Sequence, residues 1–262
     1  MKKLFIKNRK GQKISVLVEE TKGSKELVFI MQGLAGFKEK KNIATFAKTF
    51  LELGFTVVRF DTTNNLGESE GKYEDATPTG YFEDLEDIIK WSSTETFYKE
   101  PFWLCGYSIG GLCVGLYAEK YPSKVKALAP LASTISGKLS LEVARKLKPL
   151  ELKQWDETGW KVEVSNSKPG VILKLNWAQY KEDRNKYDLL KNVEKISMPV
   201  LMIVGSEDTT TPHYTQEMLF NKLQGDKELH VVKGLGHLLK EESHLKEVSQ
   251  ILEKWIIRVM KK

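Results

Sequence analysis

A serine, an aspartate and a histidine stand in three separate loops of this sequence, in a pattern that suits nucleophilic catalysis. Ser108 lies within Gly106-Tyr107-Ser108-Ile109-Gly110, and Asp208 and His237 follow much later in the chain. A serine hydroxyl is a weak nucleophile, so it needs a base that takes its proton and an acid that orients the base. We therefore predict that Ser108 is the nucleophile, His237 the base and Asp208 the orienting acid.

The residues around Ser108 predict a sharp turn between a strand and a helix. An apolar run, residues 102–105, precedes the turn, and residues 112–117 follow it with helical spacing of their apolar members. Gly106 and Gly110 leave room for the backbone to reverse, as a Gly-x-Ser-x-Gly turn requires. A glycine- and serine-rich turn without chemistry is the alternative, and five residues alone do not separate the two.

The positions of the predicted strand ends indicate which histidine and which acid belong to the candidate site. His237 follows a predicted strand in a glycine-rich loop, and Asp208 has the equivalent place after the preceding strand. Open α/β sheets build their sites at such strand ends. Glu207 is the rival acid, but it should face the other side of the loop. The other histidines fall within a strand or at helix starts: His213, His230 and His244.

Two backbone N–H groups are predicted to stabilise the negative oxygen of a tetrahedral intermediate. One belongs to Ile109, directly after the nucleophile, and the other to Leu34, in the loop after the third strand. Gly33 lets the backbone of that loop come close to the reacting atoms. Because both donors are backbone groups, replacing the Leu34 side chain would test packing more than catalysis.

The remainder of the chain alternates apolar strands with amphipathic helices. A hairpin of two edge strands, 3–7 and 13–19, comes first. Buried strands are then predicted at residues 27–31, 55–60, 102–105, 125–131, 198–204 and 229–232. This alternation predicts an α/β fold with a mostly parallel sheet and helices on both faces.

The alternation breaks between residues 133 and 195. A helix at 139–147 and a β-hairpin within 160–175 do not fit a series of parallel strands. We expect a small cap insertion here, with the core formed by residues 1–132 and 196–262. Its aromatic residues should mostly form the core of the cap, with one or two lining a pocket: Trp155, Trp160, Trp177, Tyr180 and Tyr187.

Composition argues against several classes of protein. The 262 residues carry a formal charge of +6, but the lysines are scattered among glutamates, which indicates a solvated surface and no nucleic-acid partner. No run approaches the ~18 apolar residues of a membrane span. The two cysteines, Cys105 and Cys113, look like small buried hydrophobes, so we expect a cytoplasmic protein. The cysteines have no metal-ligand spacing, and the sequence leaves monomer and homodimer open.

Over nearly its whole length the chain resembles the α/β-hydrolases. It is most similar to small bacterial esterases that include the cinnamoyl/feruloyl esterases, and to serine-aminopeptidase-like and monoglyceride-lipase-like hydrolases. These motifs carry the resemblance: Gln32-Gly33-Leu34-Ala35-Gly36-Phe37, Arg59-Phe60-Asp61 with Gly67-x-Ser69-x-Gly71, Gly106-Tyr107-Ser108-Ile109-Gly110-Gly111, Gly205-x-x-Asp208-x-x-x-Pro212 and Gly234-x-Gly236-His237.

The resemblance implies an eight-stranded sheet whose first two strands are antiparallel, with a cap inserted after strand six. It also implies hydrolysis of carboxylic esters through an acyl-enzyme, without metal or organic cofactor. We expect the acyl groups of these esters to be small to medium in size. The alternatives on the same three residues are an acyl-peptide or amide hydrolase and a thioesterase, and the fold could also serve a non-catalytic binding protein. Two features depart from the family: Gln32 stands where many relatives have histidine, and the loop 62–65 is long and contains asparagines.

Overall fold

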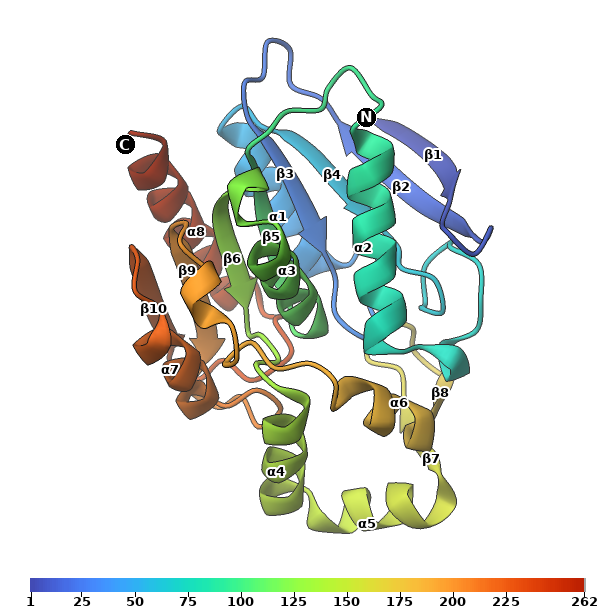
Figure 1. The fold of residues 1–262 in the computed structure, drawn as a ribbon. Coiled ribbons are helices and arrows are strands. Elements are labelled where there is room, and N and C mark those ends of the chain that lie inside the picture. The colour runs from blue at the N-terminus through green and yellow to red at the C-terminus, as the bar shows by residue number, and fades with distance from the viewer. Residues whose placement is uncertain (262) are drawn as a thin grey trace.

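An eight-stranded, mostly parallel sheet forms the centre of the protein in the computed structural model, which describes residues 1–261 (Figure 1). The strand order is β1-β2-β4-β3-β5-β6-β9-β10, and only the pairs β1–β2 and β2–β4 are antiparallel. The predicted fold is thereby confirmed, including the antiparallel first pair. The strands are β1 (Lys2–Lys7), β2 (Lys13–Glu19), β3 (Leu27–Met31), β4 (Thr56–Phe60), β5 (Phe102–Tyr107), β6 (Val125–Leu131), β9 (Val200–Gly205) and β10 (Lys227–Val232).

Helices cover both faces of this sheet and bury two apolar cores. Helices α1 (Lys41–Glu52) and α8 (Glu242–Met260) pack on one face. Helices α2 (Pro78–Ser92), α3 (Ile109–Lys120) and α7 (His213–Lys222) pack on the other. Successive side chains of a strand point to opposite faces, so the all-apolar strand β3 contributes to both cores.

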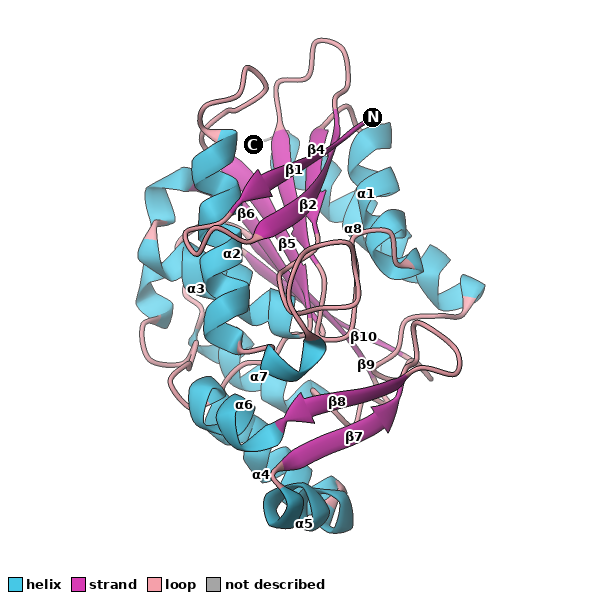
Figure 2. Cartoon of the chain, turned by 90° about the vertical axis from the view of Figure 1, so that its right-hand side faces the viewer, coloured by secondary structure: helices cyan, strands magenta, loops and turns pink. Residues whose placement is uncertain are grey.

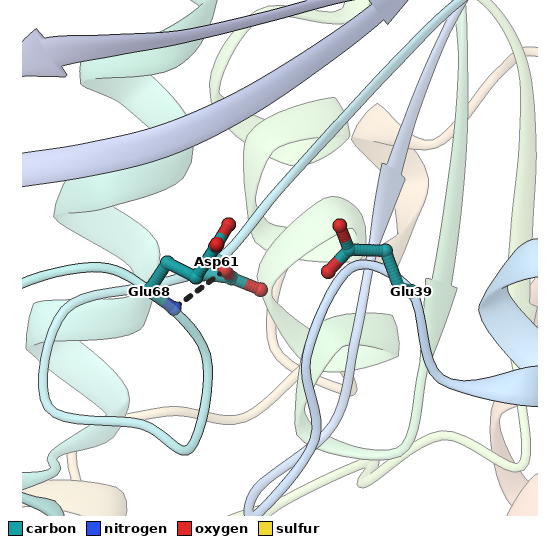
Figure 3. Close-up of side chains that lie close together, drawn as sticks. All are labelled: Glu39, Asp61 and Glu68. Atoms are coloured by element: carbon teal, nitrogen blue, oxygen red, sulfur yellow. Dashed lines mark hydrogen bonds between the residues drawn. The ribbon is translucent and has the colours of Figure 1, made fainter.

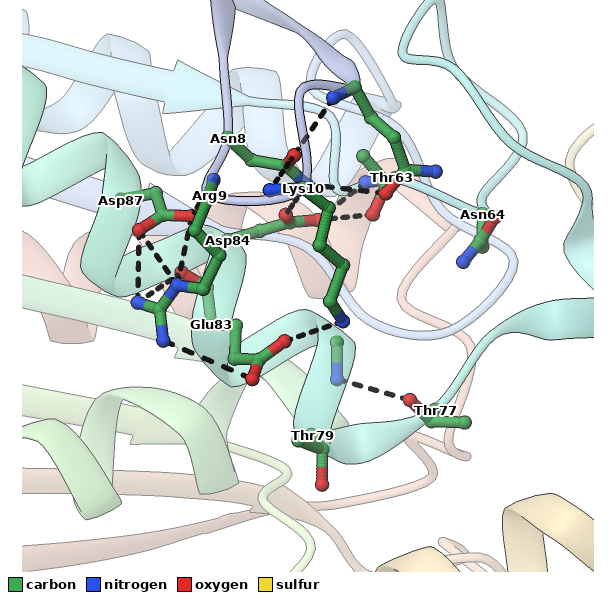
Figure 4. A network of polar contacts seen from close by, with 12 residues as sticks. Asn8, Arg9, Lys10, Thr63, Asn64, Thr77, Thr79, Glu83, Asp84 and Asp87 are labelled. Carbon is green, nitrogen blue, oxygen red and sulfur yellow. Dashed lines mark hydrogen bonds and ion pairs between the residues drawn. The ribbon is translucent and has the colours of Figure 1, made fainter.

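A polar network around Asp84 fastens the β1–β2 turn and the loop after β4 to helix α2 (Figure 4). Asn8 Nδ2 donates to Asp84 Oδ1 at 2.9 Å, and the Thr63 N–H and hydroxyl donate to Asp84 Oδ2 at 2.6 and 2.7 Å. Nearby, the Arg9 guanidinium pairs with Asp87 at 2.9 Å. These contacts attach the start of the loop after β4 to helix α2.

The segment that follows β6 contains its own small sheet and three helices. The hairpin β7 (Trp160–Val164) and β8 (Ile172–Asn176) pairs only with itself. Figure 2 shows it together with α4 (Gly137–Leu147), α5 (Pro149–Thr158) and α6 (Trp177–Arg184) at one end of the main sheet. The sequence predicted one helix here, so two were missed. Helix α5 buries only Leu152 and helix α6 is largely polar, so neither shows the apolar periodicity on which the prediction depended.

Three short 3₁₀ turns connect these elements: Tyr73–Asp75, Pro122–Lys124 and Val193–Lys195. Cys105 and Cys113 are buried and carry free thiols, and burial raises the pKa of both. Of the helices in the described part of the chain, none combines the length and the apolar character that crossing a bilayer requires.

Candidate active site

Ser108 lies in a strained turn between β5 and α3. Its backbone angles are φ 58° and ψ −119°, a conformation that costs free energy for a residue with a side chain. The turn needs glycine on either side. A Cβ on Gly106 would lie 2.3 Å from the Gly110 carbonyl oxygen, and a Cβ on Gly110 would lie 2.5 Å from the Gln32 carbonyl oxygen. The spacing of glycines in the motif therefore reflects backbone contact.

The structure brings the side chains of Ser108, His237 and Asp208 together. His237 Nε2 lies 3.1 Å from Ser108 Oγ, and His237 Nδ1 lies 2.8 Å from Asp208 Oδ2. Both distances are within hydrogen-bonding range. The imidazole can thus take the serine proton on one nitrogen while the carboxylate fixes its orientation through the other.

The surroundings of Asp208 keep its carboxylate ionised. Burial by itself would raise the pKa of Asp208. The hydrogen bond and the charge of His237 and the N–H groups of Thr211 and Thr210 all lower this pKa. Together they outweigh the effect of burial, so the pKa of Asp208 lies below its usual value. Glu207, the rival acid, is exposed to solvent. The acid in contact with His237 is therefore Asp208.

Two residues that the sequence did not single out support this arrangement. The Thr211 hydroxyl donates to Asp208 Oδ2 at 2.9 Å and also lies 3.3 Å from His237 Nδ1. The Tyr107 hydroxyl donates to the backbone carbonyl of His237. Thr211 could have been suspected, because a hydroxyl three residues after an aspartate often bonds within the same turn. Tyr107 occupies a variable position of its motif, which gave no signal.

The two predicted oxyanion donors border the same cavity as Ser108. Among the residues that the structure describes, neither the Leu34 N–H nor the Ile109 N–H has an acceptor. A Cβ on Gly33 would lie only 3.1 Å from Ser108 Cβ, so the Leu34 loop approaches the nucleophile closely. Free N–H groups beside a nucleophile suit a negative oxygen that develops there.

Gln32 joins the end of β3 to the loop after β4. Its side chain is fully buried. In the orientation that gives both the amide nitrogen and the amide oxygen a partner, the nitrogen donates to the Phe60 carbonyl at 2.6 Å. The oxygen then accepts from the Thr62 N–H at 2.9 Å. Asn65 Nδ2 donates to the Thr62 hydroxyl at 3.2 Å. The two departures from the family pattern, Gln32 and the loop 62–65, thus contact one another.

A cavity of about 550 Å³ opens above Ser108, between the core loops and the segment 133–195. Three of the five aromatic residues of that segment line it, Trp155, Trp177 and Tyr180, where one or two were expected. Trp177 and Tyr180 stack with their ring centroids 6.3 Å apart. The cavity offers flat apolar walls close to the nucleophile.

An acidic cluster away from this cavity already holds a cation of the protein itself. The carboxylates of Glu39, Asp61 and Glu68 lie close together (Figure 3). The ammonium of Lys38, which is fully buried, lies 2.8 Å from Asp61 Oδ2 and 2.6 Å from Glu68 Oε2. Burial alone would lower the pKa of Lys38, but the hydrogen bonds that its ammonium donates to Asp61 and Glu68 raise it. Lys38 therefore supplies the positive charge that a metal would otherwise bring.

The fold and these contacts place the chain in a known class. Residues 26–158 match the family model described as alpha/beta hydrolase fold, and the chain belongs to this family. Residues 184–244 match a second model, serine aminopeptidase.

Individual relatives are esterases and lipases. The chain is 20% identical to monoacylglycerol lipase ABHD6 of Homo sapiens over 253 residues, which cover 84% of this chain and 73% of the lipase. Among solved structures, Est1E from Butyrivibrio proteoclasticus with bound ferulic acid aligns with a TM-score of 0.82 and 23% identity, over 99% and 100% of the two chains. The Pyrococcus furiosus esterase PF2001 aligns with a TM-score of 0.75 and 17% identity, over 99% and 90%. The predicted resemblance is confirmed at the level of the family.

Proposed function

We propose that this protein is a serine hydrolase that cleaves carboxylic esters of small to medium acyl groups. The observation that carries the proposal is the aligned set of Ser108, His237 and Asp208, with contacts of 3.1 and 2.8 Å at the floor of a cavity. The esterases and lipase among the relatives support the same chemistry. Each residue has a definite role in the reaction.

In the first half of the reaction, His237 Nε2 takes the Ser108 proton while Oγ bonds to the carbonyl carbon of the ester. The carbonyl π electrons move to oxygen, and the N–H groups of Leu34 and Ile109 stabilise that oxyanion. The intermediate then collapses, the bond to the alcohol oxygen breaks, and protonated His237 gives its proton to the departing oxygen. The acyl group remains on Ser108.

In the second half, water takes the place of the alcohol. His237 removes a proton from the water as it attacks the acyl carbon, and it returns the proton to Ser108 Oγ when the acid leaves. Asp208 remains ionised throughout and stabilises the imidazolium that forms in each half. The cycle as proposed uses water and the side chains and backbone N–H groups named above.

We also propose that residues 133–195 act as a cap over a core of residues 1–132 and 196–262. The supporting observation is that Trp155 and Trp177, both within this segment, line the cavity above Ser108. The cap would then select among esters, while the core performs the bond cleavage.

The test is Ser108→Ala assayed with p-nitrophenyl acetate and butyrate. We expect turnover to fall by about 10⁴- to 10⁶-fold, because no other group forms the acyl-enzyme. Ser243→Ala, which removes an exposed hydroxyl at the start of α8, is the control and should keep full activity. A fluorophosphonate probe should label the wild type and the control but not Ser108→Ala. Undiminished ester hydrolysis by Ser108→Ala would contradict the proposal.

Amide cleavage is the second candidate, and the match of residues 184–244 to the serine aminopeptidase model favours testing it. Aminoacyl-anilides and acyl thioesters are compared with esters of the same acyl group. Faster turnover of the anilides or thioesters would reassign the substrate while leaving the roles of the three residues in place. A protein that binds ligand without catalysis would neither turn over any of them nor accept the probe.

A further inference from the structure

A buried arginine without a partner lies on the wall of the cavity that contains Ser108. Arg184, the last residue of α6, is only 9% exposed and borders this cavity. Within residues 1–261 its guanidinium makes no hydrogen bond or ion pair, and Nε and Nη2 are both buried without an acceptor. Buried arginines are almost always paired, so this side chain stands out.

Aromatic rings hold the guanidinium in place. Its Cζ lies 5.0 Å from the ring centroid of Trp177 and 5.7 Å from that of Tyr180. Asp156, a carboxylate that influences Arg184 electrostatically, is engaged elsewhere: Trp177 Nε1 and Lys181 Nζ donate to its Oδ1 at 2.7 and 2.6 Å. The faces of the rings attract the positive charge of Arg184 but accept no conventional hydrogen bond from its N–H groups.

This arrangement costs folding free energy. Burial lowers the pKa of Arg184, and electrostatic interactions with Tyr180 and Asp156 offset only part of that effect. An arginine nevertheless stays protonated in proteins, so the positive charge remains buried. A group that binds there and accepts its hydrogen bonds would recover the lost solvation.

The other charges of the cavity favour an anion as that group. Lys161 and Glu163 pair with one another at 2.9 Å and largely cancel. The charged side chains that line the cavity are four cations and two acids: Lys40, Lys148, Lys161, Arg184, Glu163 and Glu207. An anionic substrate would therefore find an excess of positive charge in the cavity and, in Arg184, a largely buried donor of planar geometry.

We propose that Arg184 binds a free carboxylate of the substrate, so that the preferred esters carry a carboxylate some distance from the scissile bond. The inference rests on the proposed ester hydrolysis at Ser108 and adds its substrate class. The Nε and Nη2 edge of the guanidinium carries two parallel N–H groups, which match a carboxylate, and neither nitrogen has an acceptor within residues 1–261. Both nitrogens are buried, so a bound carboxylate reaches them by a small turn of the Arg184 side chain toward the cavity that it borders. A neutral ester would leave these donors unsatisfied.

The first experiment compares pairs of esters that differ only in the carboxylate. On the acyl side, mono-p-nitrophenyl adipate and suberate are compared with p-nitrophenyl hexanoate and octanoate. On the alcohol side, the acetate ester of a hydroxypentanoate is compared with pentyl acetate. We expect kcat/KM to favour the carboxylate by about ten- to a hundredfold in at least one series. Equal or lower values for the carboxylate in both series would overturn the proposal.

The second experiment assigns the preference to Arg184. Arg184→Met keeps an unbranched side chain against Trp177 but removes the charge, and we expect the carboxylate preference to disappear while p-nitrophenyl butyrate is still hydrolysed. Arg184→Lys should retain part of the preference. Lys186→Met removes an exposed cation two residues further on, and it should keep the full preference. If Arg184→Met keeps the preference, another cation of the cavity is responsible and the assignment is wrong.

Thermal unfolding separates this role from a structural one. A purely structural arginine would lower the unfolding temperature when replaced, whereas loss of an unpaired buried charge should raise it. Adipate should raise the unfolding temperature of the wild type more than that of Arg184→Met.

Should Arg184→Met not fold, the substrate pairs with the wild type and Arg184→Lys still decide the question. Absence of all Ser108-dependent activity would refute the proposed function, whereas activity on neutral esters without preference would refute only this inference.

Discussion

Asp208 Oδ2 lies 2.8 Å from His237 Nδ1, although the two residues are 29 positions apart in the chain. Strand β9 ends just before Asp208, and β10, its parallel neighbour, ends just before the His237 loop. Two adjacent parallel strands thus bring Asp208 and His237 to the same edge of the sheet. The pairing of β9 with β10 brings the two loops together, and the side chains of Asp208 and His237 then form the contact between them.

Replacing Asp208 tests this contact. Asp208→Asn should lower kcat by about 10³- to 10⁴-fold, because an amide favours the wrong tautomer of His237. The adjacent Glu207→Gln also removes one negative charge from the same loop and should change kcat by less than about fivefold. Steady-state kinetics on p-nitrophenyl butyrate give both values. Equal losses in the two variants would mean that the acid is wrongly assigned.

Gly33 determines how closely the Leu34 N–H can approach the nucleophile. In Gly33→Ala the new Cβ would meet Ser108 Cβ at 3.1 Å and the Tyr107 carbonyl oxygen at 3.2 Å. The loop must shift by a few tenths of an ångström, and we expect kcat to fall by about ten- to a hundredfold with little change in KM. Gly225→Ala creates a similar 3.2 Å contact, with the Ser197 carbonyl oxygen, far from the site. Comparable activity losses in both variants would point to general strain.

The buried pair of Lys38 and Asp61 contributes to stability. Both side chains are fully buried, and their charged atoms lie 2.8 Å apart. Lys38→Met leaves the Asp61 carboxylate without its counter-charge and should lower the free energy of unfolding by about 3–5 kcal/mol. Urea unfolding measures the loss, and adding Asp61→Asn to Lys38→Met should recover part of it. Lys41→Met breaks an exposed pair with Glu242 and should cost less than about 1 kcal/mol.

Glu119 makes the stability of the fold depend on pH. Burial in α3 raises the pKa of Glu119 to about 7, and its Oε1 has no partner within residues 1–261. Because this pKa is higher in the folded than in the unfolded chain, the folded state binds the proton more tightly. Stability should therefore fall as the pH rises from about 4.5 to about 7.

Glu119→Gln should remove this dependence. At pH ~8 the variant should be more stable than the wild type by about 1 kcal/mol, since partial solvent screening reduces the effect, and the difference should shrink toward pH ~5. Urea unfolding at several pH values provides the measurement. A variant that is less stable than the wild type at pH ~8 would show that ionised Glu119 stabilises the fold.

Local sequence patterns were sufficient for the main sheet and for its loops. Runs such as residues 27–31 are buried on both faces, so their composition alone indicates a covered strand. Gly106 and Gly110, two residues before and after Ser108, indicate a sharp turn. Only glycine fits there, because neighbouring backbone atoms would overlap any Cβ. Asp208 and His237 could be chosen because both follow strands. These features depend on neighbours in the chain, which a sequence displays directly.

Contacts between distant segments were decided by the tertiary structure. Arg184 resembles any other arginine at the end of a polar helix, and Trp177 and Tyr180, whose rings lie near its guanidinium, precede it on the same helix. Its burial at the cavity wall exists only because α6 packs against other segments, among them the backbone at Gly137. Gln32 looked like a departure from a family motif until the fold placed it against Thr62. The sequence by itself determined the family and the candidate residues Ser108, Asp208 and His237, since residue types and local turns identify them. Which substrate the proposed site would accept depends on the burial and the contacts of cavity residues, and only the tertiary structure brings those residues together.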